Sequence, residues 1–80
     1  MEDRQLRQVI VAALREIAPE ITDDELDDHR PLRRQVVLDS IDWLRFLVDL
    51  HERLQVDIPE VDYPQLTSVA ELIAYLKARL

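Results

Sequence analysis

The segment VLDSIDWL at positions 37–44 holds the residues best placed to take part in chemistry. Its serine, Ser40, directly follows one aspartate and stands two residues before another. An apolar helical pattern begins at once and continues to about Leu54, so Ser40 is predicted at or just inside a helix N-terminus. Unpaired backbone N–H groups and the positive end of the helix dipole favour a phosphate there. Asp39 or Ser40 could instead serve only as the helix cap, a role that both residue types commonly fill.

The same chemistry argues against catalysis by the chain itself. A serine hydroxyl is a weak nucleophile and no base stands beside Ser40, so this serine is better suited to be the substrate of another enzyme. The chain has no Cys, and any thiol chemistry must therefore come from an attached group. His29 and His51 lack a third ligand at metal spacing, and the acids at positions 23–28 lack the calcium-loop pattern and its glycine. We therefore expect no catalytic residue and no metal site.

Composition narrows the class of protein and of partner. With 80 residues, 48% of them hydrophobic and 34% charged, the chain is predicted to form one globular domain over residues 1–80. A formal net charge of −7 argues against nucleic acid and anionic membranes, and favours partners with basic docking surfaces. No apolar run resembles a signal peptide or a membrane span, so we expect a monomeric, cytoplasmic protein with no membrane insertion.

The segments that lead to Ser40 are predicted to be a helix and a loop. The first helix covers residues 3–18, and Pro19 marks its end. Its apolar stripe, predicted to be core, comprises Leu6, Val9, Ile10, Ala13, Leu14 and Ile17. Residues 29–38 are predicted to form a long loop that delivers the chain to Ser40. Loops of this length are uncommon in small domains and are often functional.

The remaining segments complete an all-α pattern. Two capping boxes, TDDE at 22–25 and SVAE at 68–71, are predicted to start a short helical turn and the last helix. Pro59 prevents helix immediately before it, and residues 60–66 are expected to hold one weak helical turn. The sequence contains no repeats that would indicate a different architecture.

The central helix, over residues 41–54, carries more apolar surface than one core face requires. At about 100° per residue it has two apolar stripes. The first comprises Trp43, Phe46, Leu47, Leu50 and Leu54, and the second comprises Ile41, Leu44 and Val48. The first stripe is predicted to be core. The second adjoins Ser40 and is bordered by Asp42, Arg45 and Asp49. It could be buried between two neighbours or could form a docking face for a partner.

The order of these segments resembles the acyl carrier protein family from end to end. The resemblance rests on LDSID at 38–42 opening the central helix, VDIPE at 56–60 after it, and TSV at 67–69 opening the last helix. It implies a small four-helix bundle with a long loop between the first two helices and a short third helix. Ser40 matches the serine that receives 4′-phosphopantetheine from coenzyme A in this family. Asp39 and Asp42 match the acids that flank it.

The resemblance also implies cofactor and partners. A phosphopantetheinyl transferase would attach the arm, and Mg²⁺ would be needed only by that enzyme. The arm would supply the thiol that the chain lacks, and acyl or aminoacyl groups would be carried on it as thioesters. A loading ligase and downstream acyl-transfer enzymes would then be partners, in fatty acid and other lipid, polyketide or specialised metabolite biosynthesis. Some family members shelter the acyl chain between their helices.

Departures from the family pattern favour a specialised stand-alone carrier with its own loading enzyme. Val37 stands where many relatives have glycine, Arg45 stands where fatty-acid carriers commonly have an acid, and Pro64 interrupts the third-helix region. The expected docking residues are Ile41, Asp42, Leu44, Arg45, Val48 and Asp49. Two alternatives stay open: an aminoacyl carrier loaded by an adenylating ligase, and an acidic helical interaction module that carries no prosthetic group.

Overall fold

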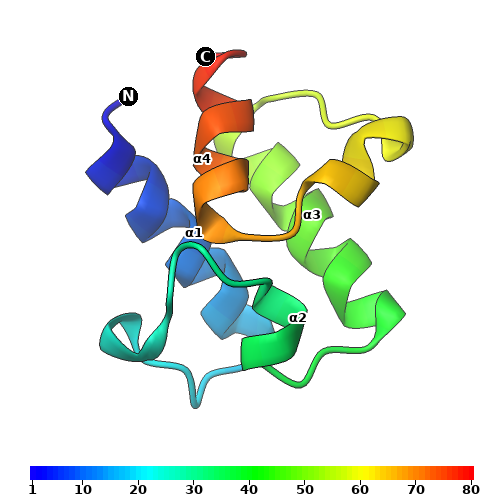
Figure 1. Ribbon diagram of the computed structural model, residues 1–80. Helices are drawn as coiled ribbons and strands as arrows, with labels where there is room; N and C mark the ends of the chain where they lie inside the picture. The colour runs from blue at the N-terminus through cyan, green and yellow to red at the C-terminus, as the bar shows by residue number, and fades with distance from the viewer.

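The computed structural model describes residues 1–80 as an all-helical chain. In chain order the elements are α1 (Asp3–Ile17), η1 (Asp23–Glu25), α2 (Leu32–Gln35), α3 (Ser40–Leu54), η2 (Glu60–Gln65) and α4 (Val69–Lys77). The two η elements are 3-10 helices, and the chain forms no strand. Figure 1 shows α1 packed against α3 and α4, with the short α2 at the end of the bundle where α3 begins. The predicted all-α carrier-like bundle with a short third helix is confirmed.

The first apolar stripe of α3 forms the centre of the core, as predicted. Phe46, Leu47 and Leu50 are fully buried, and Trp43 lies half-buried beside them. The fully buried residues that complete this core from α1 and α4 are Leu6, Ile10, Leu14, Val69, Leu72 and Leu76. Full burial of one such side chain is worth about 1.5–3 kcal/mol. The core therefore fixes which side of α3 is open to solvent.

The buried face of α1 extends beyond the predicted stripe. Val11 is buried although the spacing placed it outside that stripe, whereas Val9 and Ile17 are only half-buried. One turn earlier, Arg7 bonds to the loop that follows α1. Because residues four apart share a helix face, we infer that this loop also covers Val11. Such cover depends on the path of the loop and is invisible to helical periodicity.

The prediction of a continuous loop over residues 29–38 was wrong at α2. Leu32 is fully buried, and its backbone N–H donates to the carbonyl of Thr67 at 2.7 Å. Val36, at the other end of α2, is buried as well. Pro31 is the N-cap residue of α2, and proline is tolerated at the start of a helix. Tertiary burial of these two apolar residues stabilises a helix too short to form alone.

Side chains rather than a helix cap organise the loop between α1 and α2. Thr22 stands at the N-cap of η1 but forms no side-chain cap hydrogen bond, so the first predicted capping box was wrong. Instead, Arg7 Nε donates to the two carboxylate oxygens of Asp28 at 2.9 and 3.1 Å, and its guanidinium pairs with Asp23. Gln35 accepts from the backbone N–H of Asp27 at 2.7 Å and donates to its carbonyl at 2.8 Å. These contacts hold the approach to Ser40 in one path.

The second predicted capping box is half confirmed. Ser68 caps α4, its hydroxyl accepting from the backbone N–H of Glu71 at 3.2 Å. The Glu71 carboxylate, however, accepts from the Ser68 hydroxyl at 3.1 Å and from the Thr67 hydroxyl instead of reaching a backbone donor. The predicted start of α4 is therefore correct, and its cap has a different hydrogen-bond pattern.

The end of α3 and the placement of η2 depend on polar contacts. Gln55 ends α3 in the left-handed conformation, with φ 55° and ψ 40°, and its side-chain amide donates to the carbonyl of Glu52 at 2.7 Å. Further along, the Tyr75 hydroxyl of α4 donates to Asp62 of η2 at 2.5 Å, and the Arg79 guanidinium lies 3.6 Å from the Tyr75 ring centre. These contacts bind η2 to α4. No helix combines the length and the apolar character that crossing a membrane requires.

Candidate functional site

Ser40 is the first residue of α3, and its hydroxyl is free. Asp39 occupies the N-cap, where its carboxylate accepts the backbone N–H of Asp42 at 2.8 Å. Ser40 is exposed and its hydroxyl makes no hydrogen bond within the chain. Of the two residues that could cap this helix, Asp39 does so. The serine is thereby left available to a second molecule.

The backbone around Ser40 suits an attached phosphate. The N–H of Asp42 is used by Asp39, and the N–H of Trp43 donates to the Asp39 carbonyl at 3.0 Å. The N–H groups of Ser40 and Ile41 have no partner in the chain, because they lie in the first turn of the helix. An anion on Ser40 would meet these donors and the positive end of the α3 dipole. The residues present therefore fit a phosphodiester at this position.

The second apolar stripe of α3 is open to solvent. Ile41 is 65% exposed, Leu44 44% and Val48 42%. The alternative in which this stripe is buried between two neighbours was therefore wrong. Val37, just before α3, is 99% exposed although its neighbours in the chain, Val36 and Leu38, are both buried. An apolar surface thus runs along α3 from the residue next to Ser40.

Charged residues border this stripe on one side. Arg45 is exposed and forms no ion pair, whereas Asp42 and Asp49 are half-buried. Arg53 Nε donates to Asp49 at 2.9 Å, and Arg53 Nη2 lies 3.3 Å from a carboxylate oxygen of Glu16 on α1. A shallow groove between α1 and α3 collects these groups. Asp49 is therefore engaged within the chain, whereas Arg45 and the Asp42 carboxylate are not.

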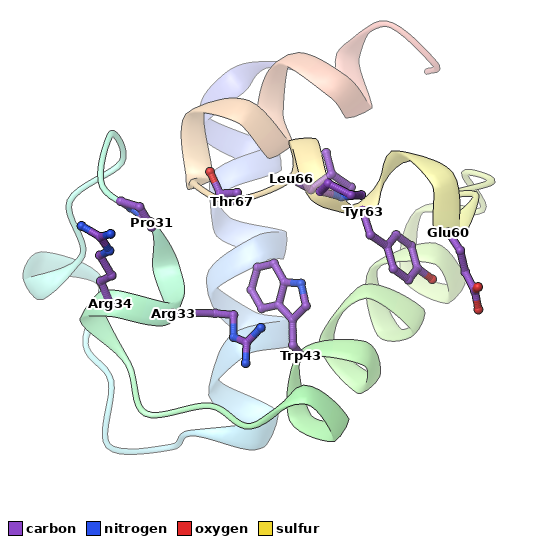
Figure 2. A pocket seen from close by; sticks show the side chains of 9 residues that line it. Pro31, Arg33, Arg34, Trp43, Glu60, Tyr63, Leu66 and Thr67 are labelled. Atoms are coloured by element: carbon purple, nitrogen blue, oxygen red, sulfur yellow. The ribbon is translucent and has the colours of Figure 1, made fainter.

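The structure also brings together a cavity that sequence patterns did not reveal. It has a volume of about 530 Å³. Its lining residues come from the start of α2, from α3, from η2 and from the segment between η2 and α4: Pro31, Arg33, Arg34, Trp43, Glu60, Tyr63, Pro64, Leu66 and Thr67. Figure 2 shows the Trp43 indole standing in this cavity. Helical periodicity predicted that Trp43 belongs to the core. The one sequence signal of a further role was that Trp43 is an aromatic residue three positions after Ser40.

The remaining candidate ligands stay apart. The His51 ring lies on the surface, its Nδ1 2.7 Å from the carbonyl of Val56, and so contributes to the turn after α3. His29 is exposed on the loop before α2. No group of three or more His, Asp or Glu side chains is placed to hold a metal ion. Of the acids at positions 23–28, Asp23 and Asp28 pair with Arg7 instead.

Comparison with protein families gives one result, and it agrees with this geometry. Residues 5–76 match the model of the phosphopantetheine attachment site family. Comparison with individual curated proteins returns no match. The family match confirms the resemblance to acyl carrier proteins, and it removes the alternative of an interaction module without a prosthetic group. The chain belongs to the phosphopantetheine attachment site family, and it is a non-catalytic carrier with a covalently attached 4′-phosphopantetheine.

Proposed function

We propose that Ser40 is the residue that carries the 4′-phosphopantetheine arm. The observation that supports this is the division of labour at the start of α3: Asp39 caps the helix, and the exposed Ser40 hydroxyl is left unused beside free backbone donors. In the transfer, Ser40 Oγ forms a new bond to phosphorus of coenzyme A and loses its proton. Adenosine 3′,5′-bisphosphate leaves, and a phosphodiester remains on the serine.

The carboxylates of Asp39 and Asp42 would act in this transfer and not in catalysis by the chain. Asp39 is the N-cap of α3 and Asp42 lies in its first turn, one on either side of Ser40 in the sequence. Oxygen ligands of this kind attract Mg²⁺ or basic groups of a transferase. Once attached, the arm supplies a thiol to a chain that has no Cys. Acyl or aminoacyl groups are then carried as thioesters.

The proposed role is that of a specialised carrier domain over residues 1–80, monomeric and acting in the cytoplasm. Its partners would be a transferase, a loading ligase, and downstream enzymes of lipid, polyketide or specialised metabolite biosynthesis. The exposed stripe of Ile41, Leu44 and Val48 supports docking along α3. Arg45, exposed and unpaired between Asp42 and Asp49, supports a partner surface with mixed charge instead of a uniformly basic one.

Intact mass measures this proposal directly. Incubation of the apo protein with coenzyme A and a broad-specificity transferase should add the mass of one phosphopantetheinyl group. Ser40→Ala should add none. Thr22→Ala is the matched control, because it removes another exposed hydroxyl at the start of a short helix, where that hydroxyl caps nothing. Labelling of Ser40→Ala, or loss of labelling in Thr22→Ala, would contradict the assignment.

The class of cargo is accessible by the same measurement. Protein purified from its own host should carry the arm together with whatever is loaded on it. A mass that corresponds to an amino acid would favour the adenylating-ligase alternative, and one that corresponds to an acyl chain would favour lipid or polyketide synthesis.

A further inference from the structure

The cavity beside Trp43 presents hydrogen-bond donors for which the chain supplies no acceptor. Arg33, on α2, forms neither an ion pair nor a side-chain hydrogen bond, and Figure 2 shows its guanidinium turned toward the indole. The indole N–H of Trp43 has no hydrogen-bond partner in the chain either, and this N–H is not fully buried. Both groups are donors only. In Figure 2 the indole nitrogen and the Arg33 guanidinium lie on different sides of the indole ring.

Acceptors in the cavity wall are either committed or directed elsewhere. The Thr67 hydroxyl donates to the Glu71 carboxylate. In Figure 2 the carboxylate of Glu60 points away from the indole, as does the guanidinium of Arg34. Tyr63 adds a hydroxyl that can donate or accept. Arg33 thus brings an unpaired cation to the cavity, and a cation of this kind is the complement of a carboxylate.

The cavity lies within reach of an arm on Ser40. Ser40 and Trp43 are three residues apart in α3, which places them about one turn apart and near the same helix face. A phosphopantetheine arm is several times longer than one helical turn. The phosphodiester would stay at the helix N-terminus, where the N–H groups of Ser40 and Ile41 are free. Folding back along α3, the arm would deliver its acyl end to the cavity.

We propose that this cavity binds the loaded end of the arm, and that the cargo is a short acyl group with a terminal carboxylate that pairs with Arg33. The proposal rests on the proposed attachment at Ser40. Arg33 is then a residue that determines cargo specificity, and its planar guanidinium can hold a carboxylate through two parallel hydrogen bonds. A neutral acyl chain of the same shape would leave this exposed guanidinium without that pairing. The cavity volume of about 530 Å³ is in the range of small-molecule sites.

The test compares two arms of the same shape and different charge. Apo protein is loaded by a broad-specificity transferase with succinyl or 4-methylpentanoyl arms, each as an amide-linked coenzyme A analogue that resists hydrolysis. Trp43 is the only tryptophan of the chain, so its fluorescence and its indole ¹H–¹⁵N signal report on this cavity alone. The succinyl arm should shift both signals, with a ratio of docked to free arm about tenfold higher than for the neutral arm. High salt should reduce the difference.

Charge-matched variants identify the counter-ion. Arg33→Gln should remove the response that is specific to succinyl. Arg15→Gln should retain it, because Arg15 is an exposed, unpaired arginine of α1 that does not line the cavity. Arg33→Lys, which keeps the charge and loses the fork, should retain only part of it.

Each other outcome overturns a stated part of the reasoning. Equal signals for the two arms would refute recognition of a carboxylate. A full response from the free-thiol arm, lost in Arg33→Gln, would show that the phosphodiester is the anion that Arg33 binds. The absence of any mass increase on loading would instead overturn the attachment at Ser40, and with it the basis of this proposal.

Discussion

The cap of α3 separates the structural role of Asp39 from the proposed chemical role of Ser40. The Asp39 carboxylate accepts the backbone N–H of Asp42 at 2.8 Å, and Asp39→Ala leaves that donor without its partner in the protein. Loss of such a cap costs about 0.5–2 kcal/mol, typically about 1. In a chain of this length, 1 kcal/mol corresponds to a fall in Tm of about 4–8 °C. We therefore expect Asp39→Ala to lower Tm by about that amount.

Two further variants sharpen the expectation. Asp39→Ser restores a good N-cap and should regain most of the lost stability, while removing the charge. Ser40→Ala removes a hydroxyl that bonds to nothing in the chain, so its effect should stay within about 0.5 kcal/mol. The assays are thermal unfolding of the apo proteins and intact mass after incubation with transferase and coenzyme A. If Ser40→Ala were destabilised and Asp39→Ala were not, the serine would be the cap and the argument for its availability would fail.

Three further predictions concern the core, the proposed docking face and the C-terminal contacts. Leu50→Ala should destabilise the chain by about 2–5 kcal/mol, because Leu50 is fully buried; an unchanged denaturant midpoint would contradict the packing of α3. Arg45→Glu should increase turnover of the loaded carrier by general fatty-acid synthase enzymes at low salt and impair loading by its own ligase; equal rates with both would make Arg45 a solvated surface residue. Burial, and then the hydrogen bond to Asp62, raise the pKa of Tyr75, so the folded state retains this proton more tightly than the unfolded state does. The stability that this raised pKa contributes is present below the unfolded pKa of about 10 and is lost as the pH rises through the pKa of the folded state. The free energy of unfolding should therefore fall less steeply with pH in Tyr75→Phe than in the parent. Parallel profiles of the two proteins would refute this.

Local patterns in the sequence were sufficient for the elements that carry their own signal. The periodicity of α3 predicted that Leu50 is core and that Leu44 lies on another face, because helix geometry alone sets their angular separation. The position of Ser40 at the start of α3 followed from the same pattern together with the acid before it. The carrier role was implied by the resemblance to the acyl carrier protein family, and the family match bears that resemblance out.

Only the tertiary structure decided which of several locally equivalent options is used. Asp39 and Ser40 are both good caps, and the choice depends on the backbone at the start of α3, where Asp39 is extended and Ser40 is already helical. The helix α2 exists because Leu32 is buried against distant segments, which no local propensity reports. The cavity at Trp43 requires α2, α3 and η2 to converge. From the sequence alone, Arg33 was predicted to lie in a loop. Periodicity gives the direction of a side chain around its own helix. Caps, short helices and cavities depend instead on contacts with segments that are distant in the sequence.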